Sequence, residues 1–367
     1  MRLRYLVSLL AVALVGCGMF FWPRVGSAGE VSSNYHYRVL AAIRHGNLQV
    51  FPVVAEASHD TKEFLTLDEG LRSGDVVVSE SGSTAPLVRP RDGHIPTRRP
   101  PGGPQVNQLV LVNNSKRPLI LLAGEIVTGG KQDRVIGKDR LVPAESDPVD
   151  LGVFCVEPGR WTGQKASFDA GGVGAGMAQP AVREKAMAAK DQQQVWSEVR
   201  NSQAQMAATL TAPAAEAVQG TSSYAKVMSN DEVKQRVDSV AAPIQRDYQS
   251  LIKQLRDRNA VGVVVAVNGE IIWADIFAST DLLEKYWPKL VRSYATEAFV
   301  TRAKSQEASL KQAQEFLEDL EGRRETVETE PGVYRHTEIT GDGFKAFELT
   351  SLLPKTGFDL HVAKMAD

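Results

Sequence analysis

Residues Pro118 to Trp161 read PLILLAGEIVTGGKQDRVIGKDRLVPAESDPVDLGVFCVEPGRW and place two apolar runs on either side of a charged turn. The five apolar residues from Leu119 to Ala123 predict a buried strand that ends just before Glu125. The pair Gly129-Gly130 predicts a turn after it, and residues 151–156 predict a second strand. The stretch therefore predicts two strands whose ends both carry polar side chains.

These polar side chains form a candidate site. A carboxylate just past a buried strand, such as that of Glu125, is placed where binding groups are commonly presented and can act as a general base. Lys131 and Arg134 supply cationic donors that suit phosphate or carboxylate groups. If the two strands converge, Glu157 joins the same site. The predicted catalytic residues are Glu125 and Glu157, and the predicted ligand-binding residues are Gly129, Gly130, Lys131, Gln132, Arg134, Arg160 and Trp161.

The same residues allow two other interpretations. Glu125 and Arg134 could pair with each other and brace a turn, as exposed ion pairs often do. Glu125 and Glu157 could instead hold a metal ion together with Cys155, but no histidine accompanies them, and we predict no metal ligands. The glycine pair is followed by Lys-Gln rather than by Lys-Ser or Lys-Thr, which excludes a P-loop.

Residues 1–28 have the layout of an export signal. Two arginines precede an apolar run from Tyr5 to Val15, which is too short to be assumed a permanent membrane span. Cys17 completes a lipoprotein box and is predicted to be lipidated. Cleavage after Ala28, an uncleaved anchor and no export are the alternatives. The sequence thus predicts an exported protein that is either lipid-anchored to the bacterial envelope or periplasmic or secreted, and that contacts the membrane only through its N-terminus.

Strand patterns dominate residues 30–160 and return near the C-terminus. An Arg- and Pro-rich insertion at 81–105 and a Gly-rich connector at 162–179 interrupt the regular pattern. Residues 71–75 predict a turn. The strands we expect are 35–43, 48–54, 64–67, 76–78, 109–113, 119–123, 261–267, 271–277, 334–340, 344–350 and 358–363.

Helical periodicity fills the centre of the chain. Apolar residues from Val233 to Leu255 recur at steps of three and four and form one continuous face, in which Pro243 predicts a kink. Further helices are expected over 196–210, 281–298 and 305–321. The order of strands, then helices, then strands along the sequence predicts an α+β fold. We expect a single domain over 35–363. It would consist of a β-rich N-terminal part, a central helical segment and a C-terminal part with a hairpin and a helix.

Composition limits the partners of the protein. The 367 residues contain 42 Lys and Arg against 44 Asp and Glu, so the net charge of −2 argues against a nucleic-acid partner. A hydrophobic content of 43% is enough for a buried core. The six histidines show no metal-ligand spacing, and we predict no cofactor.

Four motifs resemble one known family. GEIVTGGKQDRVI at 124–136 and VFCVEPGRW at 153–161 are similar to the ARG and Rhodanese-Phosphatase-superfamily-associated protein domain. VVVAVNGEIIWADIF at 263–277 and LLEKYWPKLVRSYATEAF at 282–299 resemble the second half of that family. The resemblance covers residues 35–363 and implies one integrated α+β domain in which the polar cluster is a site. The insertion at 81–105 departs from the family pattern.

Three functions follow as hypotheses. The first is an exported or envelope-anchored domain whose polar cluster binds a small anionic ligand, phosphate- or nucleotide-like, with or without catalysis. The second is a non-catalytic envelope module that binds another protein through the Val233–Leu255 face and the 81–105 insertion. The third is a metal-dependent hydrolase. Neither the motifs nor the resemblance names a reaction.

Overall fold

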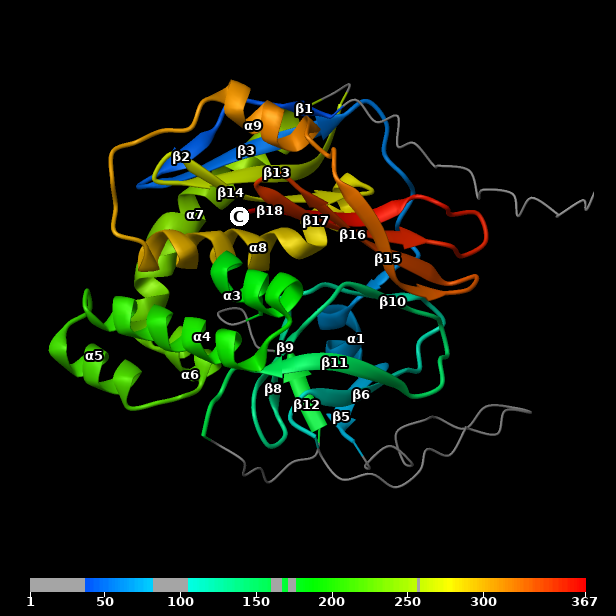
Figure 1. Cartoon of the computed structure of the whole chain (residues 1–367), viewed down its shortest axis with the longest axis horizontal. Coiled ribbons are helices and arrows are strands. Elements are labelled where there is room, and N and C mark those ends of the chain that lie inside the picture. The colour runs from blue at the N-terminus through cyan, green and yellow to red at the C-terminus, as the bar shows by residue number, and fades with distance from the viewer. Residues whose placement is uncertain (1–36, 82–104, 160–166, 171–175, 256–257) are drawn as a thin grey trace, which may run out of the picture. The chain divides into compact units, whose positions relative to one another are not determined.

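A large antiparallel sheet forms one half of the fold in the computed structural model, which describes residues 37–81, 105–159, 167–170, 176–255 and 258–367. Its strand order among these residues is β1-β3-β13-β14-β18-β17-β16-β15, and β2 also pairs with β3 (Figure 1). The last strand of the chain, β18, therefore lies inside the sheet between β14 and β17. The strands are β1 Arg38–Val39, β2 Ile43–His45, β3 Leu48–Ala55, β13 Asn259–Val267, β14 Glu270–Phe277, β15 Arg323–Glu330, β16 Tyr334–Gly341, β17 Phe344–Ser351 and β18 Asp359–Ala366.

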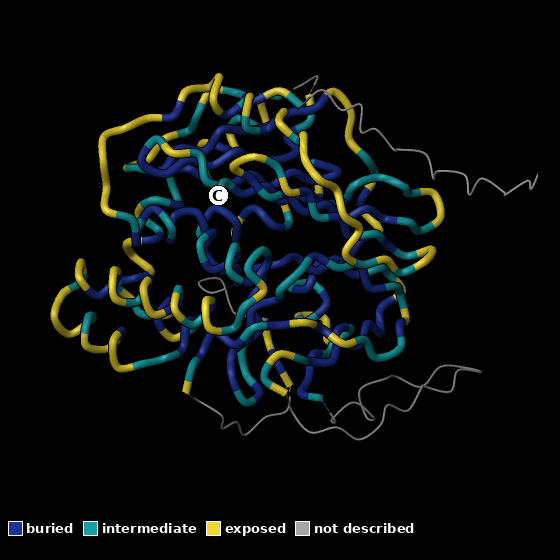
Figure 2. The backbone as a smooth tube through the Cα atoms, in the orientation of Figure 1, coloured by how far each residue is buried: buried dark blue, intermediate teal, exposed yellow. Residues whose placement is uncertain are grey.

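Helices cover both faces of this sheet because its strands alternate two sets of apolar side chains. Val263 and Val265 of β13 pack into the cluster formed with α7 (Asp231–Gln254) and α8 (Thr280–Val300). Val264 packs on the other face, into the cluster formed with α9 (Leu310–Glu318). Most of α8 is buried, as Figure 2 shows.

A closed six-stranded barrel forms the other half, in the order β11-β6-β5-β12-β8-β9. Leu111, Val127 and Phe168 are among the side chains that fill it. A small sheet of order β10-β7-β4 lies beside the barrel. The strands are β4 Leu65–Thr66, β5 Val76–Glu80, β6 Gln108–Asn113, β7 Leu119–Leu121, β8 Ile126–Gly129, β9 Arg134–Ile136, β10 Arg140–Val142, β11 Val149–Cys155 and β12 Ser167–Ala170.

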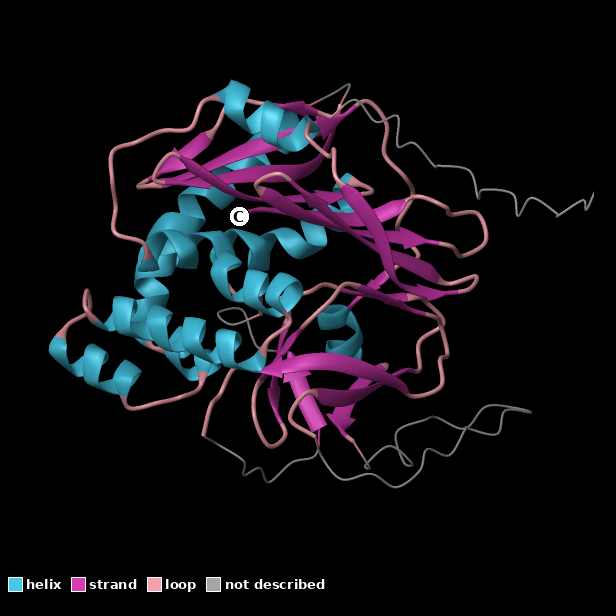
Figure 3. Cartoon of the chain, viewed as in Figure 1, coloured by secondary structure: helices cyan, strands magenta, loops and turns pink. Residues whose placement is uncertain are grey.

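The remaining helices lie mostly between the β12 and β13 strands in sequence, and they cluster on one side of the barrel (Figure 3). They are α3 Pro180–Glu184, the π-helix η1 Lys185–Ala189, α4 Gln192–Ala207, α5 Ala212–Gln219 and α6 Tyr224–Ser229, while α1 Leu67–Ser73 precedes β5. No helix of the described residues is both long and apolar enough to cross a membrane. The α+β class is confirmed.

Several local expectations are wrong. Residues 67–73 form helix α1 rather than a strand end and turn, because Thr66 and Glu69 make a reciprocal capping box. Strand β12 lies inside the segment expected to be only a connector, and the charged strand β15 was not expected at all. Helix α9 begins at Leu310 rather than near Ser305, since Ser309 caps it. The 81–105 insertion lies almost entirely outside the described residues.

Candidate functional site

The predicted site residues are divided between the two ends of strand β8. Glu125 directly precedes the first residue of β8, whereas Gly129, Gly130 and Lys131 lie at its far end. Four residues of extended chain separate these ends by about 13 Å. Because β9 starts at Arg134 and β11 ends at Cys155, where the two residues pair, Glu157 joins the far end and not Glu125.

The far end collects five buried polar side chains, which we call the polar barrel end: Glu80, Gln132, Asp133, Arg134 and Glu157. The side-chain amide of Gln132 donates to the backbone oxygen of Glu157 over 3.1 Å. The backbone N–H of Asp133 donates to the Glu157 carboxylate, also over 3.1 Å. The two strand ends therefore converge, as the sequence predicted for Glu157.

Arg134 is buried close to several acidic side chains of the protein. Its side chain is fully buried, and burial lowers its pKa, although the nearby Cys155 and Glu80 act in the opposite direction. Asp133 and Glu157 oppose the lowering as well. Burial also raises the pKa of the Cys155 thiol, which keeps it protonated. Three carboxylates therefore lie near Arg134 and act against the lowering of its pKa, whereas Glu125 lies at the other end of β8.

Two acceptor atoms of the polar barrel end are buried without a hydrogen-bond partner among the described residues. They are Glu80 Oε2 and Gln132 Oε1. The other carboxylate oxygen of Glu80 accepts from the backbone N–H of Lys131 over 2.8 Å. Buried polar atoms are nearly always satisfied, so these two acceptors are atoms to which a water molecule or a ligand could donate.

The glycine pair has a packing role. Gly130 has φ +51°, and a Cβ there would lie 2.2 Å from the Phe168 ring and 2.7 Å from Glu80 Oε1. Gly129 has φ +121°, and a Cβ there would lie 2.9 Å from the backbone oxygen of Ser167. Because glycine has no side chain, β12 can pack closely against both residues.

Glu125 lies in a different environment. Its Oε1 accepts from Lys289 Nζ on α8 over 2.5 Å, and its Oε2 accepts from the backbone N–H of Leu122 over 2.7 Å. Asp68 Oδ2 contacts the same Nζ over 2.9 Å. Burial favours the neutral amine, but the two carboxylates raise the pKa of Lys289 and keep it an ammonium. The pairing of Glu125 with Arg134 that the sequence allowed is therefore wrong, because Lys289 takes that place.

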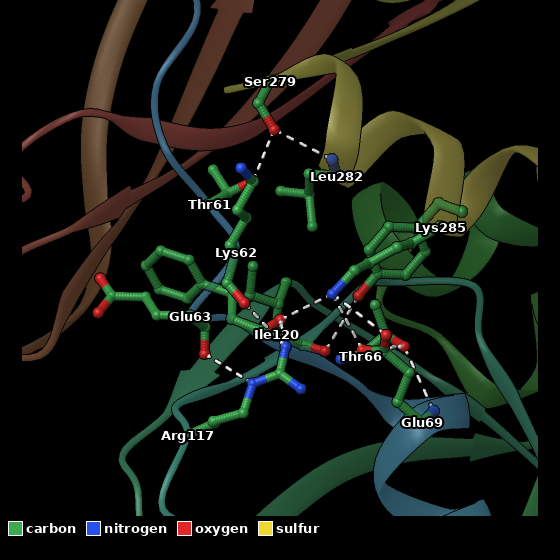
Figure 4. Close-up of polar contacts among 12 residues, drawn as sticks. Thr61, Lys62, Glu63, Thr66, Glu69, Arg117, Ile120, Ser279, Leu282 and Lys285 are labelled. Carbon is green, nitrogen blue, oxygen red and sulfur yellow. Dashed lines mark hydrogen bonds and ion pairs between the residues drawn. The ribbon is translucent and has the colours of Figure 1, made fainter.

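A neighbouring set of contacts joins the same elements. Lys285 of α8 donates to the backbone oxygen of Phe64 over 3.0 Å and contacts the Glu69 carboxylate, as Figure 4 shows. Arg117 donates to the backbone oxygens of Lys62, Glu63 and Phe64. Glu125 and Lys289 therefore belong to a layer of ionic contacts that joins α1 and the β7–β8 segment to α8.

A second buried cluster was not predicted. We call it the ionic network: Asp139, Arg183, Asp275, Tyr294 and His361. Arg183 donates through two nitrogens to the Asp275 carboxylate, each over 2.9 Å. The ring nitrogens of His361 contact Asp139 Oδ2 over 2.5 Å and Asp275 Oδ1 over 3.1 Å. The hydroxyl of Tyr294 donates to Asp275. None of these side chains has exposed surface.

The charges of the ionic network balance. Burial would lower the pKa of His361, but Asp139 and Asp275 raise it to about 9, so the ring is an imidazolium at neutral pH. Burial would raise the pKa of Asp275, yet Arg183 and His361 hold it far below its ordinary value. Two cations therefore offset two carboxylates. Gly124 belongs to the same arrangement, since a Cβ there would lie 2.5 Å from Cγ of Arg183.

Sequence reasoning missed the ionic network because its members come from five separate elements and loops. The histidines were judged by ligand spacing along the chain, which cannot reveal a contact between Asp139 and His361, 222 positions apart. The only local signal was Gly124, whose left-handed φ of +96° marks a close approach.

The remaining expectations have separate outcomes. Among the described residues, no group of three or more His, Cys, Asp and Glu side chains could hold a metal ion. Cys155 forms no metal site with Glu125, because Glu125 lies at the other end of β8. Cys17, Arg160 and Trp161 lie outside the described residues.

Comparison with known proteins gives one match. The family model described as the ARG and Rhodanese-Phosphatase-superfamily-associated Protein domain matches residues 36–363. No curated protein and no solved structure matches the chain. The match covers both the polar barrel end and the ionic network, and the family description specifies no activity. The chain belongs to the ARG and Rhodanese-Phosphatase-superfamily-associated Protein domain family.

Proposed function

We propose that this domain binds a small polar ligand at the polar barrel end, and that the ligand combines hydroxyl or amino donors with an anionic, phosphate-like group. One observation carries the proposal: the open acceptors Glu80 Oε2 and Gln132 Oε1 lie buried in the same cluster. A ligand donor would satisfy both atoms, which otherwise cost about 1–3 kcal/mol each. Mouths of β-barrels are common ligand sites.

The anionic part of the ligand falls to Lys131. Lys131 is half-buried, and its backbone N–H donates to the Glu80 carboxylate at this end of β8. Glu157 is our candidate for a catalytic carboxylate because its side chain is buried at this end and accepts from the backbone N–H of Asp133. Glu125 is not assigned to this site, since Lys289 binds it at the opposite end of β8.

The test compares the two ends of β8. Thermal unfolding is measured with inorganic phosphate, a sugar phosphate and a nucleoside monophosphate, using the wild type and the variants Glu80→Gln, Gln132→Leu and Glu125→Gln. We expect at least one organic phosphate to raise the Tm, with the shift lost in the first two variants and retained in the third. A panel without any shift, or a shift that only Glu125→Gln removes, contradicts the proposal.

The protein-binding alternative receives less support. Val233, Val237, Ala241, Ile244 and Tyr248 of α7 are buried within the domain, so this face is covered by the protein itself. The 81–105 insertion, its other expected surface, lies outside the described residues apart from its ends.

We also propose export and lipidation, on the sequence of residues 1–28 alone. The experiment is cell fractionation and mass spectrometry of the wild type and of Cys17→Ala. Lipid on the N-terminal cysteine, lost in the variant, would support an envelope anchor. An unmodified, full-length cytoplasmic chain would contradict it.

A further inference from the structure

A cavity of about 200 Å³ lies just past the C-terminal end of β9, whereas the polar barrel end is at the start of that strand. Lys138 lines it from the turn after β9, Met187 from η1, and Lys190 from the residue that follows η1. Strands β15, β16 and β17 contribute Glu328, His336 and Phe347. We call it the β16 cavity. It uses none of the residues assigned to the polar barrel end, so it is argued independently of the proposed function.

His336 is the unusual residue of this cavity. It is 2% exposed, and neither ring nitrogen has a hydrogen-bond partner among the described residues. Its ring stacks on Phe347, with centroids 5.9 Å apart. An imidazole always carries at least one N–H donor, and a buried donor without an acceptor is costly. A molecule in the cavity with an acceptor oxygen would remove that cost.

Two cations flank the imidazole. Burial lowers the pKa of His336, and Lys138 and Lys190 lower it further, while Asp139 and Glu338 oppose them. Burial, Arg140 and Lys190 likewise lower the pKa of Lys138. The cationic groups thus disfavour one another's charge, and an anion between them would relieve this repulsion.

Glu328 lines the cavity and Glu338 lies near it, and each of them pairs with a lysine. Glu328 contacts Lys138, and Glu338 contacts Lys190 over 2.8 Å. Both lysine side chains remain more than one third exposed, so they can turn towards a ligand. These ion pairs leave His336 without a partner.

The backbone around the cavity is irregular. The π-helix η1 replaces α-helical geometry for five residues, a rare feature that often accompanies functional sites. Lys190 ends it in the left-handed region, at φ 52°. Together these features place Met187 and Lys190 on the cavity wall.

We propose that the β16 cavity binds a small molecule with a carboxylate or phosphate group on a short apolar body, with His336, Lys138 and Lys190 holding the anionic group. Met187 and Phe347 form apolar wall for the body. A cavity of about 150 Å³ takes up benzene, so this one has room for a ring with a carboxylate. Benzoate and phenyl phosphate are therefore suitable probes.

The experiment is titration of the full-length protein with benzoate, phenyl phosphate and neutral benzyl alcohol, followed by ligand-observed NMR and calorimetry. The variants are Lys190→Gln and His336→Asn, with Lys311→Gln on exposed α9 as the matched control. We expect one or both anions to bind, benzyl alcohol not to bind, and each cavity variant to weaken binding about tenfold, the effect of one lost charge-assisted hydrogen bond. The relative affinity of the two anions distinguishes carboxylate from phosphate.

Two outcomes would overturn the proposal. One is that neither anion binds, which would mean that solvent alone satisfies His336. The other is that Lys190→Gln, a substitution at a half-exposed side chain, binds the anion as tightly as the wild type. Glu80→Gln should leave benzoate binding unchanged, and loss of binding in that variant would place the anion at the polar barrel end instead.

Discussion

His361 Nδ1 and Asp139 Oδ2 lie 2.5 Å apart, and neither side chain has any exposed surface. Asp139 precedes β10 beside the barrel, whereas His361 belongs to β18 in the middle of the large sheet. The contact therefore joins the two halves of the fold through a charged pair in the core. A buried ion pair adds little to the free energy of unfolding when both partners are present, but removal of one partner is strongly destabilising.

Removal of the His361 ring should destabilise the protein strongly. His361→Gln leaves Asp139 and Asp275 buried with only Arg183 to offset two negative charges, so we expect a loss of about 3–5 kcal/mol in the free energy of unfolding. Urea denaturation followed by circular dichroism measures this change. His45→Gln, at an exposed position, serves as the control and should change stability by less than about 0.5 kcal/mol. Equal effects of both substitutions would contradict the role of the network.

The stabilisation by His361 should depend on pH. Its pKa is about 9 in the folded protein against 6.5 in the unfolded chain, so the contribution is fully present below pH 6.5 and is lost as pH rises through 9. The difference in unfolding free energy between wild type and His361→Gln should therefore shrink from pH 7 to pH 10. Its pH-dependent part should amount to a few kcal/mol, about 1.4 kcal/mol per pKa unit. A constant difference over this range would mean that the ring is neutral in the fold.

The two partners in the Glu125–Lys289 pair should respond unequally to substitution. Lys289→Met leaves Glu125 buried without a cation, and should cost about 3 kcal/mol or more. Glu125→Gln should cost less, because Lys289 keeps the Asp68 carboxylate, which is one third exposed. Chemical denaturation of both variants measures the order. The reverse order would mean that the buried amine, rather than the carboxylate, carries the larger desolvation cost.

Gly124 should not tolerate alanine. Its φ is +96°, and a Cβ would lie 2.5 Å from Arg183, the cation of the ionic network that binds Asp275. Strain and displacement of Arg183 together should cost about 2–4 kcal/mol. Gly152→Ala is the matched control, since nothing lies within 4 Å of its Cβ position. Equal Tm values for Gly124→Ala and Gly152→Ala would contradict this account.

Elements with strong local signals were predicted well. The Asn268-Gly269 turn has φ of +55° and +80° and joins β13 to β14 as expected, and Asn230 caps α7 near its expected start. Strand β15 was missed because its sequence, RRETVETE, is mostly charged and shows no apolar alternation, although charged residues are common in edge strands.

The site could be predicted only in part. The convergence of Gln132 with Glu157 followed from two adjacent strand ends. The prediction that Glu125 lies near Gln132 and Glu157 was wrong, because strand β8 separates Glu125 from the glycine pair. His336 and the ionic network depend on contacts between β16, β18 and the loop after β9, which neither spacing nor periodicity encodes.

The position of β18 has a consequence for the order of folding during synthesis. Because β18 is synthesised after both β14 and β17, with which it pairs, the sheet stays split until β18 has left the ribosome. Until then Asp139 and Asp275 have no imidazolium between them. A nascent chain that lacks β18 therefore has only Arg183 to offset two carboxylates and an open seam between β14 and β17, so the addition of residues 359–366 closes the sheet.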